Sequence, residues 1–274
     1  MGKRRMSLFM VVMMGSLLIP GAFGRARPVT PQAYVPLVRH DPWITLFNGV
    51  NLDGWYTWLP STGRNNDPSQ VFKVDDGLLH FLDLPETGAD QEFGYLASEQ
   101  EYGDVLLHVE YRWGVKRFPP RATAKRDSGV LYLVTGPDVI WPRSVEAQVQ
   151  EGDTGDLVLL NGPVADTTVA SLSASPRRYQ PGGIAYTAGL GGSEYVYKNA
   201  TYDSLTEWNT VEVLVQNGSL THRVNGEVNF FASNLRQPDP AAPGTLVPLR
   251  RGRILLQAEG AEIFYRTIKI KHLP

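Results

Sequence analysis

Pairs of asparagine or aspartate with glycine recur along this chain, and they constrain its fold more than any other feature. They are Asn48-Gly49, Asp53-Gly54, Asp76-Gly77, Asn217-Gly218 and Asn225-Gly226. Such pairs favour the tight turn that joins two antiparallel strands. No stretch sustains a helical period with caps over three turns, and the best helical candidate, around residues 91–102, is brief. The sequence therefore predicts a fold made of antiparallel sheets.

Short segments with strand-like side-chain patterns lie between these turns. They are 71–74, 78–82, 104–113, 129–134, 144–150, 157–160, 194–198, 209–216, 219–224, 227–231, 253–259 and 262–271. Many short strands with glycine-rich turns favour a two-layer or closed architecture such as a jelly roll. Residues 161–193 and the proline-rich 236–248 are predicted to be long loops at the rim of the sheets, where binding residues often lie. We find no repeat and expect a single all-β domain over residues 41–274.

The first 24 residues have the pattern of an export signal. Lys3, Arg4 and Arg5 precede an apolar run from Met6 to Ile19, and Ala22-Phe23-Gly24 forms a small-x-small cleavage site. The apolar run is shorter than the roughly 20 residues that a spanning helix needs. We therefore expect a periplasmic or secreted protein with no stable membrane insertion after cleavage. Residues 25–40, rich in proline and arginine, are expected to form an extended tether.

Charge and cysteine content exclude several classes of protein. Without residues 1–24 the chain has 23 basic and 28 acidic residues. This acidic balance argues against nucleic acid or an anionic membrane as partner. Because the chain has no cysteine, it has no disulfide, no thiolate nucleophile and no cysteine-based zinc site.

Residues 144–150 alternate strictly between apolar and polar side chains. Val145, Ala147 and Val149 fall on one face of the expected strand, and Glu146 and Gln148 fall on the other. A row of carboxylate and carboxamide groups on one sheet face suits a polyhydroxylated ligand. The pattern therefore predicts an oligosaccharide or glycoside as the partner, and the acid-rich residues 151–156 that follow are expected at the same site.

Other strands carry polar groups that could share this face. Glu110 lies on the polar side of residues 104–113, and Gln257 and Glu259 lie on the polar side of 253–259. Arg266 falls in the same phase as the apolar Ile268, where an unpaired charge would be very costly. We expect Arg266 to meet a carboxylate or a ligand. The alternatives are a bulge that frees Arg266 to solvent, or a structural pair with Glu259 or Glu110.

Five blocks of sequence occur in an order that resembles a known family. They are WITLFNGVNLDGW (43–55), KRDSGVLYLVTG (125–136), SVEAQVQEGDTGD (144–156), EWNTVEV (207–213) and LLQAEGAEIFYRTIKI (255–270). Together they look like the 3-keto-disaccharide hydrolase family, also described as 3-keto-glucoside lyase/hydratase domains. The resemblance implies a concanavalin A-like jelly-roll sandwich, bacterial export, and action on glycosides whose C3 hydroxyl is already oxidised to a ketone. Relatives often carry histidine where this chain has Leu133, which would remove an imidazole ligand or base.

The chemistry that the resemblance implies needs a base, a cation and an acid. A C3 ketone acidifies the proton on C2, a base removes it, and the substituent on C1 leaves before water adds. Glu146 is the candidate base, Gln148 a neighbour that orients a hydroxyl, and Arg266 the clamp for the enolate oxygen. Glu151 or Asp153 is the candidate acid toward the leaving oxygen, or could hold a hard divalent cation through oxygen ligands. Either carboxylate could instead cap a turn, which is the interpretation favoured for Asp153.

The remaining candidates are expected to contact substrate. Glu110, Gln257, Glu259 and Arg126 are assigned to substrate binding, and Trp141 is expected either to stack on a sugar ring or to pack at the rim. Asp127 is interpreted as shaping an Asp-Ser-Gly turn, and the basic loop 116–126 as largely a solvated flap.

No cofactor other than a divalent cation is expected. The histidines show no pair spacing typical of a zinc site, and no GxGxxG segment follows a strand and opens a helix. The ketone would therefore have to be made elsewhere, by an upstream sugar 3-oxidoreductase.

Two other functions fit the same strand. Glu146-x-Gln148-x-x-Glu151 resembles the E-x-D-x-x-E pattern of retaining glucanases with its central acid neutralised. Such a double displacement would need two carboxyl groups about 5–5.5 Å apart. The second alternative is a carbohydrate-binding module without catalysis, which leucine at position 133 favours.

Overall fold

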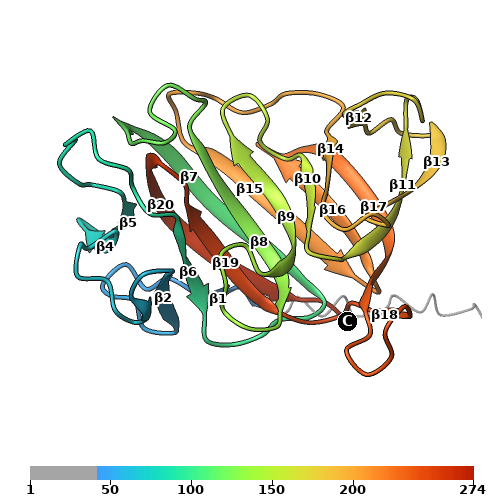
Figure 1. Cartoon of the computed structure of the whole chain (residues 1–274), viewed down its shortest axis with the longest axis horizontal. Coiled ribbons are helices and arrows are strands. Elements are labelled where there is room, and N and C mark those ends of the chain that lie inside the picture. Colours follow the sequence, from blue (N-terminus) through green and yellow to red (C-terminus); the bar gives the residue numbers. More distant parts are fainter. Residues whose placement is uncertain (1–41) are drawn as a thin grey trace, which may run out of the picture. The chain divides into compact units, whose positions relative to one another are not determined.

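The computed structural model describes residues 42–274, and this part of the chain contains strands and no helix. The expected export signal and tether lie outside the described residues. Among these residues no helix is long and apolar enough to cross a membrane. Two sheets pack face to face (Figure 1), which makes the fold a concanavalin A-like jelly-roll sandwich.

Sheet A has eleven strands. Across the sheet they are β13 (Ile184–Ala188), β11 (Val164–Val169), β17 (Glu227–Pro238), β16 (Ser219–Val224), β15 (Asn209–Gln216), β7 (Val105–Arg117), β20 (Ala261–His272), β5 (Leu78–Phe81) and β4 (Phe72–Asp75), with β1 (Ile44–Thr45) on β20 and β18 (Leu246–Pro248) on β17.

Sheet B has nine strands. Across the sheet they are β12 (Arg177–Arg178), β14 (Glu194–Tyr197), β10 (Leu157–Leu160), β9 (Arg143–Gln150), β8 (Asp127–Thr135), β19 (Arg253–Ala258), β6 (Gly94–Ser98), β2 (Trp55–Leu59) and β3 (Gly63–Arg64). Strand β19, which is far from β8 and β9 in the sequence, thus lies beside β8 in the middle of this sheet.

The core fills the space between the two sheets. Val145, Ala147 and Val149 of β9 face it from sheet B, and Leu107 and Val109 of β7 face it from sheet A. Fully burying one such side chain stabilises a fold by roughly 1.5–3 kcal/mol. Because side chains alternate along a strand, the same alternation sends the polar residues of β9 to the outer face of sheet B.

Every strand predicted from the sequence is present, but both segments predicted to be long loops contain further strands. Residues 91–102 contain β6 rather than a helix, because the apolar run 95–97 is buried on both faces of a central strand. The predicted loop 161–193 contains β11, β12 and β13, and the predicted loop 236–248 contains the end of β17 and all of β18. The apolar runs in these two segments are shorter and show neither a clear strand period nor a clear helix period.

Candidate functional site

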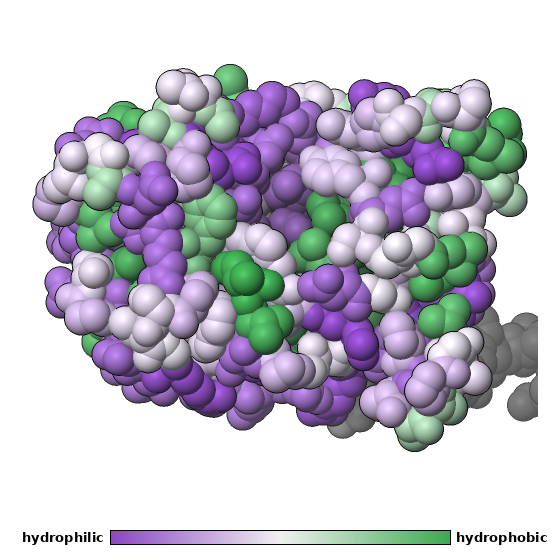
Figure 2. All heavy atoms as spheres, viewed as in Figure 1, coloured by the Kyte–Doolittle hydropathy of each residue, from purple (hydrophilic) through white to green (hydrophobic). Residues whose placement is uncertain are grey.

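The outer face of sheet B carries a group of buried polar side chains where β8, β9 and β19 adjoin. In the register, Gly129 of β8 pairs with Gln148 of β9, and Leu131 pairs with Glu146. Glu146, Gln148 and Gln257 are all less than 9% exposed. Figure 2 shows a hollow with a hydrophilic floor near the middle of the viewed face, where β8 and β9 run in Figure 1.

Glu146 and Gln257 converge on the space beside Gly129. A Cβ atom added to Gly129 would lie 2.1 Å from Glu146 Oε1 and 2.2 Å from Gln257 Oε1. Glycine within a strand often marks such a close approach. Neither oxygen has a hydrogen-bond partner among residues 42–274, although both atoms are buried. The pair therefore offers a carboxyl group with unused hydrogen-bonding capacity.

Arg121 supplies a positive charge to this face from the loop between β7 and β8. Its guanidinium makes an ion pair with Asp127 and lies 3.5 Å from Glu259 Oε1. Asp127 also accepts a hydrogen bond from Gln150 Nε2 at 2.5 Å. We call Asp127, Glu146 and Glu259 the acidic cluster. One arginine thus contacts two of its three carboxyl groups.

Burial raises the pKa of all three carboxyl groups. The pKa of Glu146 lies well above its usual value because of burial and then the charges of Glu259 and Asp127. Burial and the charge of Asp127 raise the pKa of Glu259 to about 8, against the effect of Arg121. Burial raises the pKa of Asp127 to about 6, again opposed by Arg121. Carboxyl groups with such pKa values can exchange protons near neutral pH.

Trp141 lies at the edge of the same face. It packs against an apolar cluster that includes Leu131 and Leu255, and its ring stacks on Phe93 with centroids 6.2 Å apart. Leu131 is the register partner of Glu146. Trp141 thus packs at the rim, and its expected stacking on a sugar ring stays a prediction.

The expectation that Arg266 meets Glu146 in one pocket was wrong. Arg266 belongs to β20 of sheet A, and its Nε donates to Glu110 Oε2 at 2.7 Å. A register shift between Tyr265 and Thr267 takes Arg266 out of the apolar phase, so its side chain is 43% exposed. Both structural alternatives, the bulge and the pair with Glu110, are therefore correct. Glu110 is likewise away from the acidic cluster.

Glu151 and Arg126 pair with each other instead of facing the hollow. Arg126 Nε donates to Glu151 Oε1 at 2.6 Å, and Arg117 Nη2 lies 3.2 Å from the same carboxylate. Burial alone would raise the pKa of Glu151, but the hydrogen bonds from Arg126 hold it below its usual value. Asp153 pairs with Lys125 at 2.5 Å. These pairings do not favour Glu151 as an acid, and they leave neither carboxylate free for a cation.

The glucanase pattern has no matching geometry. It requires Glu151 beside Glu146, but Glu151 follows the end of β9 and is held by two arginines. Leu133 is also placed differently from the expectation. It has a φ of 52° at a register shift in β8 and packs in the core between the sheets. A side chain at position 133 therefore does not reach the outer face of sheet B.

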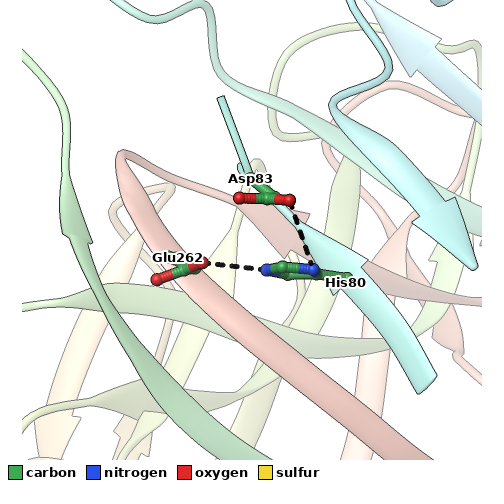
Figure 3. Close-up of side chains that lie close together, drawn as sticks. All are labelled: His80, Asp83 and Glu262. Atoms are coloured by element: carbon green, nitrogen blue, oxygen red, sulfur yellow. Dashed lines mark hydrogen bonds and ion pairs between the residues drawn. The ribbon is translucent and has the colours of Figure 1, made fainter. Parts of the chain in front are cut away.

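A second polar cluster, on sheet A, joins His80, Asp83 and Glu262 (Figure 3). His80 Nε2 lies 2.9 Å from Glu262 Oε1, and its Nδ1 lies 3.8 Å from Asp83 Oδ2. The two carboxylates therefore meet opposite nitrogens of the ring, and Lys73 and Lys116 each approach Asp83 to 2.5 Å. One donor atom from each of the three residues lies within 4.8 Å of the others, but the two lysines already balance the charge of Asp83. The cluster fits an ion-pair network better than a metal centre.

Arg121 was not among the site residues predicted from the sequence, and Asp127 was predicted to have a different role. Asp127 was interpreted as a turn residue, but it is the first residue of β8 and faces Arg121 and Gln150. Extending the predicted strand 129–134 by two residues would have put Asp127 in phase with Gly129. Nothing in the basic loop 116–126 indicates which of its cations reaches the sheet.

Comparisons with known proteins place the chain in a family. The sequence profile described as "3-keto-alpha-glucoside-1,2-lyase-like domain" matches residues 42–271. Two crystal structures of a candidate glycosyl hydrolase from Parabacteroides distasonis ATCC 8503 are similar. The first has a TM-score of 0.51 and 18% identity, over 85% of this chain and 94% of that chain. The second has a TM-score of 0.49 and 18% identity, over 85% and 100%.

A Bacillus licheniformis β-glucanase has a TM-score of 0.45 and 14% identity, over 86% of this chain and 100% of that chain. No curated protein matches the chain. At 18% identity the first Parabacteroides distasonis structure supports the jelly-roll fold alone, whereas the profile covers nearly all of the described residues. The chain belongs to the family of 3-keto-alpha-glucoside-1,2-lyase-like domains.

Proposed function

We propose that this protein cleaves the glycosidic bond of 3-keto-glycosides by proton abstraction, elimination and hydration. Membership of the family supports a carbohydrate-active role. The observation that carries the specific reaction is the buried Glu146 Oε1, which has no hydrogen-bond partner within residues 42–274 and lies beside a glycine that leaves room for it. A desolvated carboxylate is a stronger base than an exposed one.

The reaction starts at the C2–H bond, which the C3 ketone acidifies. A base takes the proton, and the electron pair forms an enolate with its negative charge on the C3 oxygen. The enolate then re-forms the ketone, a C1=C2 double bond appears, and the C1–O bond to the aglycone breaks. The departing oxygen takes a proton from an acid. Water adds at C1, C2 regains a proton, and the product is the free 3-keto sugar.

Three charged groups of the site match these steps. Glu146 is the proposed base, and its raised pKa makes the ionised form a strong proton acceptor. Arg121 is the proposed cation beside the enolate, in place of Arg266, because it is the guanidinium that reaches the acidic cluster. Glu259, with a pKa of about 8, is protonated at neutral pH and can act as the acid toward the leaving oxygen.

Two amides on the same face would hold the sugar hydroxyls. Gln148 lies beside Gly129 in the register, and its side-chain Oε1 accepts a hydrogen bond from the Val149 N–H at 2.9 Å. This bond fixes the orientation of the amide. Gln257 faces the same space from β19. Fixed amides impose geometry on a ligand at a low cost in side-chain entropy.

Incubation of the mature protein with 3-keto-trehalose and 3-keto-lactose, beside the unoxidised sugars, tests the proposal. Release of 3-keto-glucose from the oxidised sugars alone is the expected result. Cleavage of an unoxidised β-glucan would instead support a glucanase, and binding without product would support a carbohydrate-binding module.

The proposal includes a location and a supplier of substrate. Residues 1–24 have the pattern of an export signal, so we place the reaction in the periplasm or outside the cell. The ketone must come from an upstream sugar 3-oxidoreductase. Detection of the mature protein in a periplasmic or culture-medium fraction of the native host tests the location.

A further inference from the structure

The loop between β8 and β9, residues 136–142, carries apolar side chains that the proposed chemistry does not use. Val139 is 44% exposed and Ile140 is 41% exposed, and Trp141 follows them. Figure 2 shows a hydrophobic patch beside the hollow, where this loop lies in Figure 1. We call Val139, Ile140, Trp141 and Phe93 the apolar lip.

The loop is firmly anchored to sheet B. Asp138 Oδ1 accepts hydrogen bonds from Tyr56 Oη at 2.7 Å, Tyr95 Oη at 3.1 Å and Arg253 Nη1 at 2.8 Å. Arg253 Nη2 also donates to the Gly136 carbonyl oxygen at 3.0 Å. A partly buried carboxylate with three donors fixes the start of the loop. Val139 and Ile140 are therefore exposed to solvent on a segment that hydrogen bonds fix to sheet B.

The end of the loop is held in a costly conformation. Trp141 has a φ of 52°, which is rare and unfavourable for a bulky residue. Asn161 Nδ2 donates to the Trp141 carbonyl oxygen at 2.6 Å, and the Trp141 ring stacks on Phe93. These contacts keep the indole beside the cluster that contains Leu131, the register partner of Glu146. The lip thus borders the candidate base.

We propose that the apolar lip is the subsite for the aglycone, and that it takes a flat aromatic aglycone in preference to a second sugar. This inference rests on the proposed function. Aliphatic side chains offer no partners for sugar hydroxyls, and burying a hydroxyl without a hydrogen-bond partner is unfavourable. An aromatic ring has no such groups and gains contact with Ile140 and Trp141. The carboxyl and amide groups nearby remain for the keto sugar.

The test compares phenyl 3-keto-β-glucoside with 3-keto-cellobiose as substrates of the parent and of Ile140→Ser. Phenol leaves more easily than a sugar, but this difference cancels when the ratio of the two kcat/KM values is compared between variants. We expect the kcat/KM for the phenyl glycoside divided by that for 3-keto-cellobiose to fall about tenfold in Ile140→Ser. One apolar contact typically contributes that much to discrimination between two substrates. Leu190→Ser is the control, because Leu190 is 69% exposed on another loop. An unchanged ratio in Ile140→Ser would overturn the inference.

A binding measurement separates this inference from the reaction. Tryptophan fluorescence can follow titration of the parent and Ile140→Ser with phenyl β-glucoside and with cellobiose. Tighter binding of the phenyl glycoside, lost in Ile140→Ser, would support the lip even if no keto-glycoside were turned over, in which case only the proposed reaction fails. Equal binding of both glycosides to both proteins would overturn the assignment of the apolar lip as the aglycone subsite.

Discussion

The carboxylate of Glu146 occupies the space that a side chain at Gly129 would need. A Cβ atom at Gly129 would lie 2.1 Å from Glu146 Oε1, closer than two unbonded heavy atoms can come. The base proposed for this site therefore depends on a residue that has no functional group of its own.

Gly129→Ala should abolish most turnover and lower stability. The added methyl group must displace Glu146 and Gln257, and overpacking of this kind typically costs about 1–3 kcal/mol. Thermal unfolding and initial rates with a 3-keto-glycoside measure the two effects. Gly191→Ala is the matched control, because a Cβ there meets nothing within 4 Å. Full activity in Gly129→Ala would show that the position of Glu146 is not critical.

Arg266→Ala should leave kcat unchanged. Its guanidinium pairs with Glu110 on sheet A, where it also lies over the Trp208 ring at 4.3 Å. Exposed ion pairs contribute about 0.2–1 kcal/mol, so only a small loss of stability is expected. Steady-state kinetics and urea unfolding check both points. A large fall in kcat without unfolding would show that Arg266 takes part in catalysis.

Arg121→Gln should lower kcat by about 10²-fold or more, because it removes the cation proposed to stabilise the enolate. The pKa of Asp127 should rise further without the opposing charge. Titration of the carboxyl carbons by NMR would detect this shift, which a merely structural loss would not produce. Arg121→Lys should recover part of the activity. Equal activity of the parent and Arg121→Gln would exclude this role.

The contribution of Glu259 to stability should fall as pH rises from about 4.5 to 8. Glu259 has a folded pKa of about 8, above the ordinary value of about 4.3 for an unfolded chain. Between these two values the folded protein binds more protons than the unfolded chain, so each rise in pH favours unfolding. The glutamine side chain in Glu259→Gln cannot ionise, so stability should depend less on pH in this variant. Its Tm at pH 8 should be a few degrees above that of the parent. The same slope in both proteins would contradict the raised pKa.

The polar face of sheet B could be predicted because alternation within one strand decides which side chains share a face. Residues 144–150 alternate without a break and residues 253–259 alternate apart from Leu255, and both place their polar groups as predicted. Alternation does not say which sheet a strand joins. Glu146 and Arg266 could therefore be assigned to faces but not to the same pocket.

Bulges and loops account for the remaining errors at the site. The register shift between Tyr265 and Thr267 changes the phase of Arg266, and the shift in β8 turns Leu133 into the core. Neither shift has a glycine to mark it. Arg121 reaches the acidic cluster through the path of a loop, which depends on contacts between distant segments such as the Phe118 N–H and the Gly260 carbonyl oxygen.

The central claim is that Glu146 removes the C2 proton, and the most direct measurement is the fate of that proton in D₂O. A 3-keto-glycoside cleaved by the parent should give 3-keto-glucose with deuterium at C2, detected by NMR or mass spectrometry. Glu146→Gln should give neither product nor exchange, and 3-keto-glucose kept alone in D₂O sets the background. Product released at the parent rate with hydrogen retained at C2 would contradict the account.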